Sequence, residues 1–301
     1  MLTNKDIYQE SLVNHIYFAG SIRSFCTTIG LTFFKNNQDY IDRAIALGYR
    51  ATDIINESIL IMNKELADTI LSNDVYITPY TKELDLLTER LFDINLVIGV
   101  DKDLEILKNK SSVNYDEIID RINKLNSDSL ELINEFKEYV TEIKTKLETG
   151  ELFSYLYIDF FNYMFDEISV YGRDIKRIES KKDYTEFYLR EFTYYFNELL
   201  RSSAKYIRGF LDTNEGEYFD KASYFVNAFA SLTEKYLKNK DNSSLKIETE
   251  RLVISYKEYV VNVIESLLES KTYLITPPST LDNFLTNVNV YLFILNYTKK
   301  L

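Results

Sequence analysis

Few residues in this 301-residue chain have side chains suited to nucleophilic or metal chemistry. The chain has one histidine, His15, and one cysteine, Cys26. A single cysteine excludes a disulfide within the chain and any cysteine-based zinc or iron–sulfur site. Cys26 lies in an apolar stretch and is interpreted as a small core residue, with a reactive thiol as the alternative. We interpret His15 as a structural residue at the polar edge of its helix. These two residues predict no catalytic site.

The remaining polar residues follow patterns that are typical of solvated helix faces. Carboxylates such as Glu135, Glu138 and Glu142 recur at helical spacing and are interleaved with lysines such as Lys137 and Lys144. The chain has no glycine-rich phosphate loop, because its nearest glycine pair is Gly209 and Gly216, and no Gly-x-Ser-x-Gly motif accompanies His15. We therefore expect no bound cofactor and no enzymatic activity.

The charge and hydropathy of the chain exclude two classes of partner. The chain carries 35 basic and 47 acidic residues, a net charge of −12, and its basic residues are scattered. Such a charge repels nucleic acid and anionic lipid. No stretch reaches the ~18 apolar residues that a membrane helix requires. The first residues resemble no signal peptide, so we expect synthesis in the cytoplasm.

The chain contains an internal repeat. The pattern Tyr17-Phe18-x-x-x-Ile22-Arg23-Ser24 recurs 178 residues later as Tyr195-Phe196-x-x-x-Leu200-Arg201-Ser202. At the same offset, Tyr40-Ile41-Asp42-Arg43-Ala44 recurs as Tyr218-Phe219-Asp220-Lys221-Ala222. Near the ends of the halves, Val170-Tyr171 corresponds to Val290-Tyr291 at an offset of 120. A constant offset without gaps indicates duplication, and the smaller second offset predicts an insertion in the first half.

Hydrophobic periodicity predicts an all-α fold with four long helices in each half. The chain has only 8 glycines and 3 prolines, which favours long helices and short connections. The segments are 4–33, 37–72, 113–148 and 151–180 in the first half, and 183–211, 215–238, 244–271 and 277–299 in the second. We predict a four-helix bundle over residues 1–180, with a partly helical excursion at 73–112 packed on it, and another bundle over 181–301.

These features resemble a known bacterial family. The duplicated bundles, the excursion motif Tyr76-Ile77-Thr78-Pro79-Tyr80-Thr81 and the stretch Ala204-Lys205-Tyr206-Ile207-Arg208-Gly209-Phe210-Leu211-Asp212 are similar to a family of unknown function found in spore formers, which has two tandem ferritin-like domains. The resemblance implies a metal site in each bundle, held by a Glu-His pair in the first helix and a His-x-x-x-Glu in the fourth.

This chain departs from the family pattern at nearly every ligand position. The Glu-His pair falls on Ser24-Phe25 in the first bundle and on Ser202-Ser203 in the second. The His-x-x-x-Glu falls on Tyr163 and Glu167, and on Asn283 and Asn287. Only Glu167 remains, and a chain with one histidine cannot supply the two Glu-x-x-His motifs of a di-iron site.

We therefore predict degenerate metal sites and no bound metal. Phe25 and Tyr163 place aromatic rings where ligands would sit. Ser203, Asn283 and Asn287 are expected to hydrogen-bond each other or a buried water. We expect Glu167 to pair with Arg173, with Lys176 or with a tyrosine hydroxyl. The alternative is a residual site with oxygen ligands near Glu167, or a metal held between chains.

Tyrosine is over-represented, with 25 residues in 301. A low-GC genome is one explanation, and a role in association is the other, because large amphipathic side chains suit interfaces. Proteins that resemble this one occur in spore coats. The leading hypothesis is thus a non-enzymatic, self-assembling spore-coat component with coat proteins as partners. The alternatives are a metal-binding ferritin-like oxidoreductase or storage protein, and a cytoplasmic helical adaptor that binds through residues 73–112.

Overall fold

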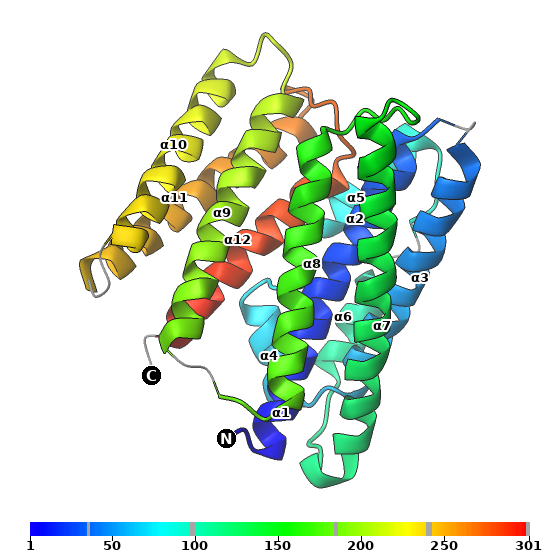
Figure 1. Cartoon of the computed structure of the whole chain (residues 1–301), viewed down its shortest axis with the longest axis vertical. Coiled ribbons are helices and arrows are strands. Elements are labelled where there is room, and N and C mark those ends of the chain that lie inside the picture. Colours follow the sequence, from blue (N-terminus) through cyan, green and yellow to red (C-terminus); the bar gives the residue numbers. More distant parts are fainter. Residues whose placement is uncertain (35–36, 97–99, 184–185, 239–242, 299–301) are drawn as a thin grey trace. The chain divides into compact units, whose positions relative to one another are not determined.

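The computed structural model describes residues 1–34, 37–96, 100–183, 186–238 and 243–298, and it is all-α (Figure 1). Within these ranges every regular element is a helix, and an isolated bridge between Leu211 and Leu274 is the only β-type pairing. The chain forms two compact units. Unit 1 comprises Met1–Ser72 and Val97–Asp183, and unit 2 comprises Asn73–Leu96 and Tyr184–Leu301.

Unit 1 is built on four long helical segments. They are α1, η1 and α2 in succession (Asn4–Asn14, His15–Ala19, Gly20–Thr32), α3 (Gln38–Ile61), α7 (Tyr115–Glu148) and α8 (Ile158–Glu179). The first segment packs on α3, α7 and α8, and α7 packs on α3 and α8. Two short helices, α4 (Lys64–Ser72) and α6 (Val100–Lys108), pack on each other, and α6 also contacts α3. The apolar face of each amphipathic helix forms the core.

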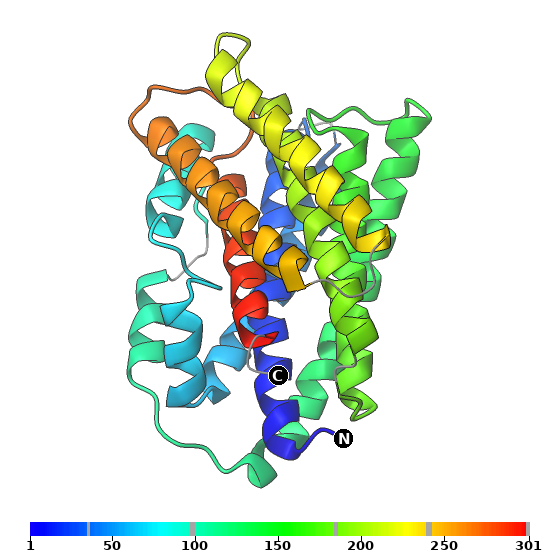
Figure 2. The same ribbon diagram turned by 90° about the vertical axis from the view of Figure 1, so that its left-hand side faces the viewer.

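Unit 2 has four long helices and one short one. They are α9 (Glu186–Phe210), α10 (Gly216–Lys238), α11 (Ser243–Leu268), α12 (Ser279–Thr298) and the short α5 (Thr81–Phe92). Helix α9 packs on α10 and α12, and α11 packs on α10 and α12. Helix α5, cyan in Figures 1 and 2, packs on α11 and α12, although it comes from the first half of the sequence.

Hydrogen bonds attach the α5 segment to unit 2. The Asp282 carboxylate on α12 accepts bonds from the hydroxyls of Thr78 (2.6 Å) and Thr81 (2.8 Å). The Tyr80 hydroxyl donates to Glu265 on α11 at 2.6 Å. The expected excursion at 73–112 is therefore divided differently from the sequence interpretation, because α5 belongs to unit 2 and only α6 belongs to unit 1.

Two helix boundaries in unit 1 also differ from the prediction. The segment 37–72 is two helices, interrupted at Met62 and Asn63. The buried Tyr8 hydroxyl donates to Ile61 O (3.0 Å) and accepts from Asn63 N (2.6 Å), so a side chain from α1 satisfies the backbone at the break. The segment 151–180 becomes helical only at Ile158. Residues 153–157 before it are non-helical, and Phe153, Tyr155 and Tyr157 among them are exposed.

Candidate functional site

Aromatic rings occupy the predicted ligand positions of unit 1. Phe25 and Tyr163 are buried, and their ring centroids lie 5.8 Å apart at 76°. Phe25 also stacks near Phe136 (6.2 Å), and Tyr163 stacks on Phe160 (5.4 Å). Edge-to-face and offset contacts of this kind are favourable packing arrangements. The sequence predicts aromatic rings at these two positions, and the structure shows that the rings are buried and pack against each other.

Glu167 is completely buried, in contrast to two of its predicted partners. Arg173 and Lys176 are exposed, whereas Glu167 has no exposed surface. Burial, with a smaller contribution from the nearby Glu167 carboxylate, holds the pKa of the buried Tyr17 well above its usual value. Tyr17 therefore lies within electrostatic range of Glu167, and the pairing of Glu167 with a tyrosine hydroxyl stays a prediction.

Neutral polar groups occupy the corresponding positions of unit 2. Ser203 is buried, donates to Leu200 O (2.9 Å) and lies 2.8 Å from the Tyr256 hydroxyl, which donates to it. Ser203 thus bonds Tyr256 and the backbone rather than the expected asparagines. Asn283 and Asn287 are also buried. Serine and asparagine are poor sets of ligands for a tightly held divalent ion.

These residues do not fit a ferritin-like metal centre. A di-iron centre needs several carboxylates and two histidines that project into one core. In the described part of the chain, no group of three or more His, Cys, Asp or Glu side chains is placed to hold a metal ion. The chemistry available at these positions is hydrogen bonding and aromatic packing.

His15 is fully buried, so the expectation that it lies at the polar edge of its helix is wrong. It begins the π-helical turn η1, and its Nε2 lies 2.9 Å from Asn126 Oδ1. Because Asn126 Oδ1 only accepts, Nε2 carries the proton and Nδ1 accepts from the Tyr171 hydroxyl at 2.6 Å. Burial lowers the pKa of His15 to about 3. A neutral, saturated imidazole of this kind is structural.

Cys26 is also a core residue. Its side chain is buried on α2, and an added Cβ at Gly48 on α3 would lie 3.4 Å from the Cys26 Cβ, so the two helices pass close together here. Burial raises the pKa of the Cys26 thiol far above neutral pH. The thiol therefore remains protonated, and the interpretation of Cys26 as a small core residue agrees with the structure.

An ionic cluster in unit 1 was not found by sequence reasoning. Asp174 has no exposed surface and accepts bonds from Arg177 Nε (2.7 Å) and Asn14 Nδ2 (2.6 Å). Arg177 also pairs with Glu10 and donates to Lys182 O at 2.7 Å. The cluster joins α1 to α8. The signal in the sequence is an Asp-x-x-Arg pair within the apolar stripe of α8, where a charge requires a partner.

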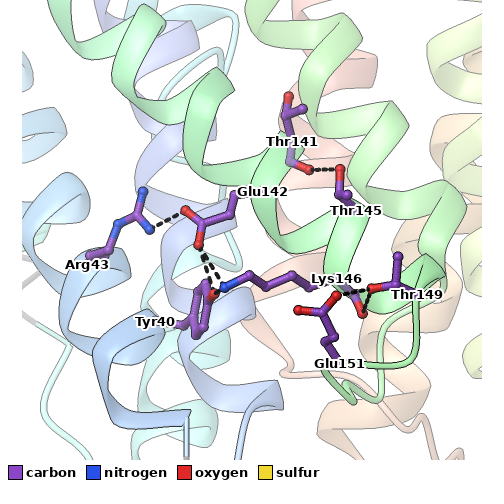
Figure 3. Close-up of polar contacts among 8 residues, drawn as sticks. All are labelled: Tyr40, Arg43, Thr141, Glu142, Thr145, Lys146, Thr149 and Glu151. Atoms are coloured by element: carbon purple, nitrogen blue, oxygen red, sulfur yellow. Dashed lines mark hydrogen bonds and ion pairs between the residues drawn. The ribbon is translucent and has the colours of Figure 1, made fainter.

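A second ionic cluster lies near the surface and joins α3 to α7 (Figure 3). Glu142 accepts bonds from the Arg43 guanidinium (2.6 Å) and the Tyr40 hydroxyl (2.8 Å), and Lys146 lies 3.2 Å away. These bonds, with that of Arg43 the largest, lower the pKa of Glu142 to about 2. The carboxylate is thus held ionised by structural partners, which agrees with the prediction of a solvated helix face.

The same side-chain contacts occur inside each unit, at residues separated by the offsets of the sequence repeat. The Tyr139 hydroxyl donates to Tyr40 O at 2.7 Å, and the Tyr259 hydroxyl donates to Tyr218 O at 3.0 Å. Tyr139 and Tyr259 are 120 residues apart, and Tyr40 and Tyr218 are 178 apart. Each unit therefore contains the same tyrosine-to-backbone bond between its second and third long helical segments.

Two further contacts show the same recurrence. Phe18 stacks on Tyr171 with centroids 5.0 Å apart, and Phe196 stacks on Tyr291 at 4.9 Å. The helix C-termini agree as well. The backbone bond from Glu151 N to Lys146 O (2.8 Å) after α7 corresponds to that from Lys271 N to Ser266 O (2.9 Å) after α11. Both are the long-range bond of a Schellman cap.

The chain is similar to known proteins both in sequence and in structure. No family model matches the chain. The chain is 20% identical over 304 residues to the spore coat protein CotB of Clostridioides difficile (strain 630), and the match covers all of both chains. Its fold is similar to the crystal structure of an uncharacterized protein from Bacillus cereus G9241, with a TM-score of 0.70 and 12% identity over 98% of this chain and 92% of the other.

Together these comparisons support a distant relationship to a spore coat protein and an all-α fold that other bacterial proteins share. No helix within the described ranges is both long enough and apolar enough to cross a membrane.

Proposed function

We propose that this chain is a structural protein of the spore coat, without enzymatic activity. The observation that carries the proposal is the similarity to a spore coat protein along the whole of both chains. Proteins of a coat must contact copies of themselves or other coat proteins, and we propose both as partners. The chain would be made in the cytoplasm and then deposited on the spore surface.

The proposed architecture is a pair of ferritin-like four-helix bundles that arose by duplication. Support comes from the tyrosine bonds, aromatic stacks and helix caps that recur at offsets of 178 and 120. A duplicated gene preserves contacts of this kind even where most residues have diverged. In this account, the α5 segment is the insertion of the first half that came to pack on the second bundle.

We propose that the metal sites implied by the family resemblance are degenerate in this chain and bind no metal. In unit 1, Phe25 and Tyr163 replace two ligands with packed rings, and in unit 2, Ser203 bonds Tyr256. Loss of the metal centre would leave the fold as a scaffold whose surface makes contacts. The competing function is a ferritin-like oxidoreductase or storage protein with a residual site near Glu167.

Metal retention separates these two functions. We expect protein incubated with excess iron, manganese or zinc and then desalted to retain well under one equivalent per chain, because serine and asparagine bind divalent ions weakly. Elemental analysis by mass spectrometry measures this. A Glu167→Gln variant should retain the same trace amount. Stoichiometric metal in the unaltered protein, lost in Glu167→Gln, would establish the residual site and contradict the structural function.

A further inference from the structure

Unit 1 exposes a cluster of aromatic rings at the end where α2 stops and α8 starts. Phe34, Phe153 and Tyr155 contact each other, with centroids 5.4 to 5.9 Å apart. Phe153 and Tyr155 are 59% and 63% exposed, and Tyr157 is 46% exposed. We call Phe34, Phe153, Tyr155 and Tyr157 the aromatic tip.

The local backbone holds these rings outward. Residues 153–157 are non-helical, with a bend at Tyr155 and Leu156, and exposed residues alternate with less exposed ones along them. Leu156 is buried, and Ser154 faces inward to lie 3.3 Å from the Thr32 hydroxyl, which places Phe153, Tyr155 and Tyr157 on the solvent side. Leu152 N bonds Lys146 O at 3.1 Å and fixes the start of the segment. The rings therefore have no route into the core without breaking these contacts.

The corresponding segment of unit 2 has the same arrangement of exposed and buried residues. Tyr273 and Ile275, which lie 120 residues after Phe153 and Tyr155, are 63% and 58% exposed. Leu274 between them is buried. Two backbone bonds hold the segment at the end of α9: Ile275 N donates to Phe210 O (2.8 Å), and Asp212 N donates to Tyr273 O (3.1 Å). Both units thus expose an apolar pair at equivalent positions. This repetition indicates an interaction surface, because exposed apolar residues scattered without a function would not repeat.

We infer that the aromatic tip is the contact by which one copy of this chain binds the same tip of a second copy, an inference that rests on the proposed function. The stretch from Phe153 to Ile158 carries no charge. Two copies that each carry a net charge of −12 repel each other. The electrostatic repulsion is smallest where uncharged aromatic faces approach each other. A symmetric contact requires only that the patch fit itself, and stacked rings do so.

The size of the tip predicts a weak, reversible contact. With about half of each ring exposed and ~200 Å² per aromatic side chain, the tip offers roughly 400 Å². A standard interface buries about 800 Å² per partner, so one tip supplies around half of what a stable dimer uses. The exposed acidic residues Glu151 and Asp159 flank the tip, and their repulsion weakens the contact at low salt. Association therefore strengthens as salt is added.

Sedimentation velocity over a range of protein and salt concentrations tests the contact. The unaltered protein should associate with rising concentration, and a Phe153→Ser, Tyr155→Ser double variant should have a dissociation constant at least about tenfold higher. Tyr49→Ser is the matched control, because Tyr49 is 51% exposed on α3 of the same unit and lies outside the tip. Its association should equal that of the unaltered protein. Far-UV circular dichroism checks that each variant is folded.

Cysteine cross-linking identifies the partner surface. Tyr155→Cys should form a disulfide-linked dimer under mild oxidation, and Tyr49→Cys should not, while the buried Cys26 contributes no reactive thiolate. Association that is unchanged in the double variant, or equal cross-linking at both positions, would overturn the tip as the contact and leave the proposed function intact. An unaltered protein that stays monomeric at every concentration and salt would overturn both the tip and the assembly role.

Discussion

Replacing Arg177 by methionine is expected to destabilise the protein by about 3–5 kcal/mol. The reason is the burial of Asp174, whose side chain has no exposed surface and whose charge Arg177 neutralises at 2.7 Å. Methionine preserves much of the packing volume but leaves the Asp174 carboxylate in a low-dielectric site without the cation that neutralises it. Removal of one partner of a buried pair costs far more than the pair contributes.

Chemical denaturation followed by far-UV circular dichroism measures this loss, because the chain has no tryptophan for fluorescence. Arg50→Met is the matched control, since Arg50 pairs with Glu131 and Glu135 on an exposed helix face and its loss should cost less than about 1 kcal/mol. The double variant Arg177→Met, Asp174→Leu should regain most of the stability. Equal small losses in Arg177→Met and Arg50→Met would show that the cluster contributes no more than a surface pair.

Acidification is expected to weaken the protein through His15. Its pKa is about 3 in the folded chain and 6.5 for an unperturbed histidine, so between pH 3 and pH 6.5 the unfolded chain binds a proton that the folded chain does not. Stability therefore falls as the pH drops from 6.5 toward 3, and it is unaffected by this group above 6.5. Well below pH 6.5 the slope is about 1.4 kcal/mol per pH unit, and the loss between pH 8 and pH 4.5 is about 2.7 kcal/mol.

A His15→Gln variant isolates this effect, because glutamine can donate to Asn126 and accept from Tyr171 but does not titrate. Its free energy of unfolding should fall less than that of the unaltered protein over the same pH range, by about 2.7 kcal/mol. Burial raises the pKa of Glu10, which acts in the opposite direction but equally in both proteins and so cancels in the difference. Parallel pH profiles for the two proteins would contradict a neutral, buried His15.

The sequence predicts much of the fold because helix formation depends largely on local pattern. The all-α class and most boundaries of the long helices follow from apolar periodicity and from the scarcity of glycine and proline. The break at Asn63 did not follow, because its backbone bonds the hydroxyl of Tyr8, 55 residues away in the sequence. The membership of α5 in unit 2 did not follow either, since Thr78 and its partner Asp282 are 204 residues apart.

The residues of the candidate site could be predicted only at the ligand positions that the family resemblance indicates. The family pattern, placed on this chain, predicts aromatic rings at Phe25 and Tyr163; their contact with each other comes from the structure alone. The burial of His15 was missed because the π-helical turn η1 rotates that part of the helix, and no residue type marks such a turn. The sequence does not predict the aromatic tip, because the uncharged stretch from Phe153 to Ile158 has the pattern of a helix start, whereas α8 begins only at Ile158.

Localisation in sporulating cells of the native host tests the central claim most directly. A fluorescent fusion of the full chain should collect on the forming spore, and the unaltered chain should be recovered in the coat extract of purified spores. A fusion that stays dispersed in the cytoplasm, with no chain in the coat extract, would contradict the account and favour a cytoplasmic adaptor.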